Sequence, residues 1–407
     1  MNMGFIEWIN KANQNVMMYQ NVSAKDWVTK PGENIGIFGG KLEQRNSVIE
    51  YAISRYLGNI GIIVLHNNEW LERDLNRFQN LYPKLFSSGY HPEVCFINNN
   101  NLIYEPFAGM GKNRIAEIIY PELSKESHNY GQQHLYSEVL KKYLDILEYM
   151  EQPFSLHNLW KLCNMRLECV EEEILSSFPV EVAKDIYATL IRDNLANQVK
   201  ADVNAFADRL EGRIWKKNAP QTSVSLVRAV QRNALISIRM TLKNLSVQDY
   251  LAAELNYLIE ENQKFVLIID SVDMGESQLK NVILNPAMNF CRILSGSSNL
   301  ELGDKVTEGD NCMLHKMDKL ILFQCVNAVA AKTYSNLMGT YLKKVTAYHK
   351  EKNRGAFDFF AGHGKGMNVS EQDYARIKPE ELATLGDGAV LIDQQQGIVE
   401  RGKRFIY

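Results

Sequence analysis

The sequence predicts an α/β protein in which a mostly parallel sheet is interrupted by a long all-α segment. Apolar runs of strand length alternate with segments of helical spacing in the first third of the chain, and such runs return in the last third. Between them, residues 130–260 show long stretches of 3.6-residue periodicity. Since a βαβ rhythm favours a parallel sheet with right-handed crossovers, we expect residues 1–129 and 261–407 to build one α/β domain. Residues 130–260 then form an inserted all-α domain.

Length and composition place the chain among ordinary globular proteins. A chain of 407 residues exceeds the size at which one core keeps growing, so two structural units are expected. The apolar fraction of 45% and the charged fraction of 23% are typical of globular domains. A formal net charge of −3 excludes a wholly basic nucleic-acid binder but is compatible with a local basic face.

The cysteines and the longest apolar runs indicate the compartment. The six cysteines form no C-x-x-C pair and several lie in apolar runs, which favours buried free thiols over disulfides or zinc. No apolar run approaches the roughly 18–20 residues of a membrane helix, and the N-terminus lacks the features of a signal peptide. We therefore expect a cytoplasmic protein without a membrane segment of its own, recruited to the inner membrane only through partners.

The elements of the first third are short. Ile35–Phe38 is predicted to be a buried strand and Val48–Tyr56 its helix. Ile60–Leu65 is a continuous apolar run, typical of a strand covered on both faces. Trp70–Leu81 has helical spacing, and Val94–Ile97 is another strand.

The middle of the chain is predicted to be helical. Its periodic segments are His134–Met150, Val180–Trp215, Ser223–Leu242 and Val247–Glu260. Ser246 precedes the last of them and can cap it. This block separates the two strand-bearing regions.

Strands return towards the C-terminus. Lys319–Cys325 is predicted to be a strand, and Ala328–Tyr341 a helix. Lys350–Gly366 is polar and contains glycines, which predicts an exposed loop. Two apolar runs, at residues 389–392 and 397–399, can form a closing hairpin.

The most informative stretch begins at the strand Ile35–Phe38. It has the strand, glycine turn and helix of a phosphate-binding loop, whose consensus is G-x-x-x-x-G-K-[ST]. With Gly40 as the first glycine, Arg45, Asn46 and Ser47 stand where glycine, lysine and serine or threonine belong. In such a loop, backbone N–H groups surround the phosphates at a helix N-terminus, the lysine reaches the outer phosphates, and the hydroxyl holds magnesium.

Two readings of this stretch remain open. In the first it binds ATP and magnesium, with the glycines making the turn and Lys41 or Arg45 replacing the lost lysine charge. In the second it is an ordinary βα turn, because the Arg45 side chain stands where a glycine normally lets the backbone approach phosphate. The candidate nucleotide-binding residues are Gly39, Gly40, Lys41, Arg45, Asn46 and Ser47.

A second motif resembles the Walker B strand of nucleotide hydrolases. Phe265–Asp270 is an apolar run that ends in a carboxylate, and ligands of parallel sheets bind at the carboxyl ends of strands. Asp270 could therefore hold magnesium together with Ser47. The usual following glutamate is absent, so Asp273 or Glu276 would have to position the attacking water. Asp270, Asp273 and Glu276 are the candidate catalytic residues.

A local excess of basic residues lies in the predicted helical block. Arg228, Arg232 and Arg239 are spaced by four and seven residues and would share a face of the predicted helix, with Lys216 and Lys217 upstream. Such a face suits the phosphates of DNA without reading its sequence. The alternative is a solvated surface.

The order of these motifs resembles a known family. The phosphate-loop strand is followed by Tyr104–Gly109, the helical block, the Walker B-like strand, Leu320–Tyr341 and Lys378–Ile392. In order and spacing, most of the chain is similar to the cytoplasmic part of type IV secretion coupling proteins, the VirD/TraD/TraG group of the FtsK–HerA class of motor ATPases.

The resemblance implies a RecA-like P-loop NTPase fold with an inserted all-α domain at the DNA entrance. It also implies a hexameric ring, ATP-driven transfer of DNA or protein, and ATP and magnesium as cofactors. By position, Ser47 would contact magnesium, Asn46 would stand in the lysine place, and Asp270 would be the Walker B acid. The implied partners are single-stranded DNA, proteins of the secretion or conjugation apparatus, and further copies of the chain.

Three functions remain open from the sequence. The first is a coupling-protein-like ATPase that handles DNA in conjugation or type IV secretion, and an active enzyme would be an ATP hydrolase and DNA translocase. The second is a catalytically dead homologue that serves as an assembly or adaptor subunit, because the lysine and second glycine of the loop are missing. The third is an unrelated α/β protein with a helical lid.

Overall fold

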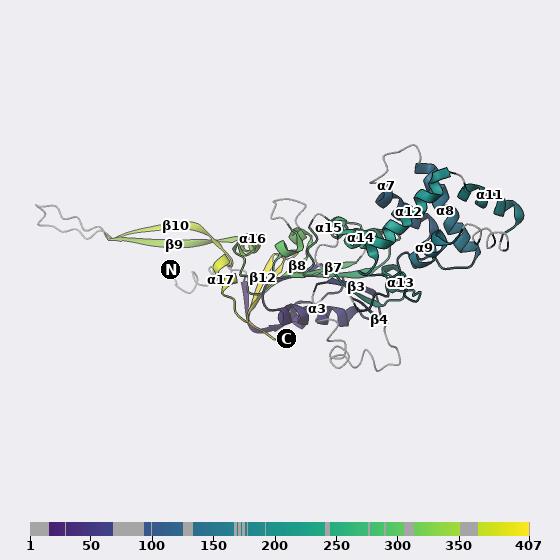
Figure 1. Cartoon of the computed structure of the whole chain (residues 1–407). Coiled ribbons are helices and arrows are strands. Elements are labelled where there is room, and N and C mark those ends of the chain that lie inside the picture. Colours follow the sequence, from purple (N-terminus) through teal and green to yellow (C-terminus); the bar gives the residue numbers. More distant parts are fainter. Residues whose placement is uncertain are drawn as a thin grey trace, which may run out of the picture.

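A ten-stranded sheet forms the centre of the computed structural model, and helices cover both of its faces (Figure 1). The structure describes residues 16–28, 30–67, 93–98, 100–124, 133–166, 169, 172, 176, 178–191, 193–240, 245–275, 277–288, 290–304, 313–350 and 365–406. None of the helices within these ranges is long and apolar enough to cross a membrane.

The strands of the main sheet lie in the order β1-β12-β11-β8-β2-β7-β6-β3-β5-β4. From β8 to β4 all neighbouring strands are parallel, whereas β11 is antiparallel to β8 and β12, and β1 is parallel to β12. Their bounds are β1 Val16–Ser23, β2 Ile35–Phe38, β3 Gly61–His66, β4 Val94–Ile97, β5 Leu235–Arg239, β6 Phe265–Asp270, β7 Cys291–Gly296, β8 Lys319–Leu322, β11 Ala389–Asp393 and β12 Ile398–Ile406.

The predicted fold class is confirmed. Strands from the first and last thirds of the chain form one sheet, since β2 and β6 both pair with β7. Every residue of β2, β3 and β6 is buried, as expected for apolar strands covered on both faces. The predicted closing hairpin is present as β11 and β12.

Five helices, α7, α8, α9, α11 and α12, make a lobe at one end of the molecule (Figure 1). Helix α3 lies on one face of the sheet. The bounds are α2 Ala24–Trp27, α3 Leu42–Tyr56, α7 Lys112–Ser124, α8 Gln133–Tyr149, α9 Leu156–Asn164, α11 Val180–Ile191, α12 Asp193–Leu210, α13 Leu226–Gln231, α14 Leu245–Glu260, α15 Gln278–Leu284, α16 Ala328–Met338 and α17 Pro379–Ala383. One hydrophobic core runs from the sheet into the lobe, and a second lies between the sheet and α3.

The prediction of one helix over Ser223–Leu242 is wrong in its second half. Helix α13 ends at Gln231, Asn233 takes a left-handed conformation with a φ of 53°, and β5 follows. An asparagine tolerates this conformation better than most residues. Strand β5 pairs with β3 and β4, so part of the predicted all-α range 130–260 belongs to the sheet. The division of the chain into two domains stays a prediction.

Two further predicted helices differ from the structure. The segment predicted as one helix over Val180–Trp215 contains α11 and α12, with residue 192 between them outside the described residues, and α12 ends at Leu210. The helix predicted over Ala328–Tyr341 ends at Met338. The predicted helix Trp70–Leu81 and most of the predicted loop Lys350–Gly366 lie outside the described residues.

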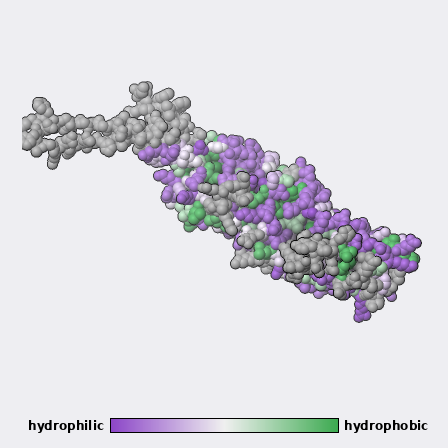
Figure 2. Space-filling view, turned by 90° about the horizontal axis from the view of Figure 1, so that it is seen from above, coloured by the Kyte–Doolittle hydropathy of each residue, from purple (hydrophilic) through white to green (hydrophobic). Residues whose placement is uncertain are grey.

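The unpredicted strands β9, Thr340–Lys350, and β10, Lys365–Ala375, pair antiparallel as a separate ribbon. This ribbon projects from the body at the end opposite the helical lobe (Figure 1). The coloured surface of the body is mostly hydrophilic in the view from above, with scattered apolar patches (Figure 2).

A buried network of one carboxylate and two tyrosines lies between the segment before α7 and two helices, α13 and α14. The hydroxyls of Tyr104 and Tyr250 both donate to the carboxylate of Glu254. The same hydroxyls accept the backbone N–H groups of Leu226 at 3.2 Å and Phe107 at 3.1 Å. The network therefore ties the segment before α7 to helices α13 and α14. Burial raises the pKa of Glu254 to about 7.

The Glu254 carboxyl makes stability depend on pH. Its folded pKa lies above the unfolded value of 4.5, so the folded chain retains a proton that the unfolded chain releases as the pH rises between these values. Stability should therefore fall across this window, by about 3 kcal/mol in total. Glu254→Gln should remove this part of the slope in urea unfolding measured from pH 4.5 to 8.

Two comparisons make this test specific. Glu105 is also buried, its pKa is raised to about 7 by burial, and it should keep its own share of the slope in the Glu254→Gln variant. Glu261→Gln, an exposed change just after α14, should leave the slope as in the wild type. An equal slope in Glu254→Gln and wild type would contradict the assignment.

Candidate functional site

The turn between β2 and α3 requires its two glycines. Gly39 and Gly40 have φ angles of +81° and +63°, which favour glycine. A Cβ atom on Gly39 would lie 2.7 Å from the carbonyl oxygen of Gln324, and one on Gly40 would lie 2.4 Å from the Cβ of Phe323. The turn therefore packs directly against the segment that follows β8, and protein atoms already fill the space beside it.

The backbone donors of this turn are already in use. The N–H of Gly39 donates to the carbonyl of Gly296 at 3.1 Å, and that of Gly40 to the carbonyl of Gln324 at 2.7 Å. The N–H of Lys41 donates to Oε1 of Gln44 at 2.9 Å. A phosphate-binding loop instead directs such groups at its ligand.

Arg45 lies in the first turn of α3, and its side chain reaches back to the β2–α3 turn. Its side chain is buried, and Nη1 donates to the carbonyl oxygens of Gly39 at 3.0 Å and Gly40 at 3.1 Å. Two acceptor oxygens thus point at a cation. Among the described residues no carboxylate forms an ion pair with Arg45.

The other residues of the motif are also occupied or unsuited to an anion. The Ser47 hydroxyl donates to the carbonyl of Gln44 at 2.8 Å. Asn46 is buried, its Oδ1 has no partner among the described residues, and its neutral amide lacks the charge of the consensus lysine. Lys41 Nζ lies 3.4 Å from a carboxylate oxygen of Asp387 at an exposed position.

The Walker B-like acid lies at the same edge of the sheet as the turn. Asp270 ends β6 and is fully buried. Strand β7 separates β6 from β2, which places the two strand ends about 10 Å apart. Asp273 is exposed and its Oδ1 accepts the N–H of Gly275 at 3.0 Å. Glu276 lies outside the described residues.

Sequence reasoning missed several polar residues at this edge. In the sheet register, Ser295, Asp270, His66 and Arg239 stand side by side on β7, β6, β3 and β5. His66 and Ser295 are fully buried, and the Ser295 hydroxyl has no partner among the described residues. The signal that could have found this row is a polar residue at the end of each apolar run.

The predicted basic face does not form as expected. Arg239 lies at the end of β5, so it shares no helical face with Arg228 and Arg232, which lie on or just after α13. Arg232 lies 3.5 Å from Glu93, and Lys217 pairs with Asp208. Arg228 donates to Gln231 at 3.1 Å, and Lys216 is exposed. Two of the five basic side chains therefore have acidic partners nearby.

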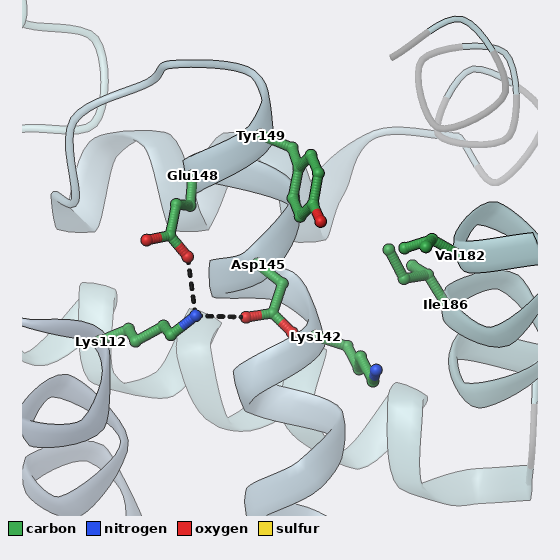
Figure 3. A pocket seen from close by; sticks show the side chains of 7 residues that line it. All are labelled: Lys112, Lys142, Asp145, Glu148, Tyr149, Val182 and Ile186. Atoms are coloured by element: carbon green, nitrogen blue, oxygen red, sulfur yellow. Dashed lines mark hydrogen bonds and ion pairs between the residues drawn. The ribbon is translucent and has the colours of Figure 1, made fainter. Parts of the chain in front are cut away.

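Two cavities lie in and beside the helical lobe. One of about 960 Å³ is lined by Gly109, Gly111 and Arg228, and also by Glu148. The other, of about 490 Å³, lies between α8 and α11 (Figure 3). Its Lys112 ammonium donates to Glu148 at 2.7 Å and to Asp145 at 3.0 Å, and these bonds raise the pKa of Lys112. Charges at this second cavity are thus paired within the protein.

Comparison with known proteins identifies the fold. No protein-family model and no curated protein matches the sequence. Among solved structures, the unbound bacterial conjugative coupling protein TrwBdeltaN70 matches with a TM-score of 0.50 and 11% identity, over 94% of this chain and 93% of that one. The chain shares its fold with this protein. This is the predicted RecA-like P-loop NTPase fold.

Two other solved structures are similar at lower scores. TrwB in complex with ADP and Mg²⁺ matches with a TM-score of 0.42 and 12% identity, over 97% of this chain and 85% of that one. VirB4 of Thermoanaerobacter pseudethanolicus matches with a TM-score of 0.40 and 11% identity, over 75% and 80%. Because both scores are below 0.5, the likeness of fold rests on unbound TrwB.

The β2–α3 turn does not fit the ATP and magnesium that the family resemblance of the sequence implies. The N–H groups of Gly39, Gly40 and Lys41 are bonded to protein acceptors, and the Arg45 guanidinium is bonded to the carbonyls of both glycines. The Ser47 hydroxyl, on α3, is bonded to the backbone. A phosphate would have to displace Arg45 and would then face two carbonyl oxygens.

Restoring the consensus lysine alone should therefore not create a nucleotide site. In Asn46→Lys the guanidinium of Arg45 still occupies the turn, so ATP binding should stay undetectable by calorimetry in the presence of magnesium. Asn46→Ala is the matched control for loss of the buried amide. Micromolar ATP binding by Asn46→Lys would contradict the geometry described for the turn.

Proposed function

We propose that the chain is a catalytically dead, coupling-protein-like subunit of a conjugative or type IV secretion system, acting in assembly or as an adaptor for DNA substrates. The observation that carries this proposal is the Arg45 guanidinium inside the turn where a motor would hold phosphate. The alternative, an active ATPase, is favoured only by the carboxylate of Asp270 at the same sheet edge.

The extent of the likeness supports a role in the same kind of assembly. The TrwB fold extends over 94% of the chain, so the likeness includes helical parts as well as the sheet. That protein is a bacterial conjugative coupling protein. By this analogy, the partners would be apparatus proteins, single-stranded DNA and further copies of the chain in a ring.

Absence of ATP hydrolysis is the first expected result. The purified chain should release no phosphate from ATP with magnesium, with or without single-stranded DNA, because the Arg45 guanidinium is bonded to the carbonyls of both glycines and the consensus lysine is absent. Asp270→Asn is the control, since release that persists in this variant comes from a contaminating enzyme. Release by the wild type that Asp270→Asn abolishes would favour the active ATPase instead.

Binding of DNA through Arg228 and Arg232 is the second expected result. If each contacts one phosphate, Arg228→Ala/Arg232→Ala should lower the slope of log affinity for single-stranded DNA against log salt by about 1.4. The control is Lys25→Ala/Lys30→Ala, which removes the same charge near β1, at the opposite edge of the sheet. Equal slopes for the two double variants would assign Arg228 and Arg232 to ordinary solvation.

A further inference from the structure

We infer that the β2–α3 turn is a built-in guanidinium site, in which Arg45 permanently takes the place of a nucleotide phosphate. This inference rests on the proposed function, since it treats the turn as closed to nucleotide. It goes further by assigning the turn a ligand of its own. The ligand is a planar cation supplied by the same chain, and its role is to hold the turn in one conformation.

The polarity of the turn carries the inference. Nη1 of Arg45 lies 3.0 Å from the carbonyl oxygen of Gly39 and 3.1 Å from that of Gly40. Carbonyl oxygens are the negative ends of peptide dipoles, so this pair attracts a cation and repels an anion. The corresponding N–H groups of both glycines point instead to Gly296 and Gln324.

The Arg45 side chain is buried near a helix N-terminus, so its charge needs the contacts with the turn. Arg45 is 7% exposed and lies near the N-terminus of α3, where the helix dipole disfavours a cation. No described carboxylate pairs with it. The two carbonyl oxygens are therefore the principal groups that offset the cost of burying this charge.

The same contacts join three strands without a bound nucleotide. Gly39 is bonded to Gly296 at the end of β7, and Gly40 to Gln324 just after β8. Because Arg45 bonds the carbonyls of both glycines, it links α3 to the point where β2, β7 and β8 end. In a nucleotide-binding domain, a bound phosphate would link loop and helix in a comparable way, but the link would be lost when the nucleotide dissociates.

The test is chemical rescue of a variant that lacks the guanidinium. Arg45→Ala should lower the midpoint of thermal unfolding by about 2–5 °C, since it removes two charge-assisted hydrogen bonds. Millimolar methylguanidinium chloride should recover part of this loss, because the free cation can enter the emptied site. Methylammonium chloride should recover less, and sodium sulfate or ADP at the same millimolar concentration should raise the midpoint no more than it does in the wild type.

The matched control is Arg55→Ala on the same helix. Arg55 Nη1 also donates to a backbone carbonyl, that of Val28 at 3.1 Å, but outside the turn. Its variant should show no specific response to methylguanidinium. Equal responses of the Arg45→Ala and Arg55→Ala variants would overturn the inference, and so would a rise in the Arg45→Ala midpoint with sulfate or ADP that exceeds the rise in the wild type.

A second variant covers the case in which Arg45→Ala does not fold. Arg45→Lys keeps a cation in the turn, so it should fold, unfold at a lower midpoint than the wild type, and respond to sulfate and ADP no more than the wild type does. Stabilisation of Arg45→Lys by either anion beyond that of the wild type would overturn the inference. Failure of rescue without ATP hydrolysis by the wild type would refute only the guanidinium site, whereas hydrolysis would refute the proposed function itself.

Discussion

The position of β6 and β7 between β2 and β3 is the constraint on which the rest of the structure depends. Strands β2 and β3 follow one another in sequence, yet two strands from the far half of the chain lie between them. The sheet can therefore form only when both halves meet. This arrangement also brings the β2–α3 turn and Asp270 to the same edge of the sheet. The helical lobe lies at one end of the molecule (Figure 1).

The β2–α3 turn has the glycines of a phosphate-binding loop but a different chemistry. The close approach of the segment after β8 requires both glycines, and α3 begins at Leu42, so the turn is shorter than a phosphate-binding loop. The direction of its peptide dipoles towards Arg45 decides what it can hold. A fold likeness over nearly the whole chain with TrwB thus describes the scaffold, while single side chains decide whether that scaffold binds nucleotide.

The sequence predicted the sheet better than it predicted the site. Continuous apolar runs such as β3 and β6 are unambiguous because burial on both faces demands them. Strand β5 was missed because its apolar residues also match a helical period, and only the pairing with β3 distinguishes the two. The role of Arg45 depends on which way two peptide groups face, and residue types alone do not specify that direction.

The pairing of β1 with β12 delays completion of the sheet during synthesis of the chain. These strands are joined in register from Val16 with Val399 to Ser23 with Ile406, although nearly the whole chain separates them. At about 5–20 residues per second, an emerging chain holds β1 without its neighbour for roughly 20–75 s. Met17, Met18 and Tyr19 are exposed even in the finished fold, so this segment is an aggregation risk throughout synthesis. Among the described strands, β12 comes latest in the sequence and completes the sheet beside β1, the earliest.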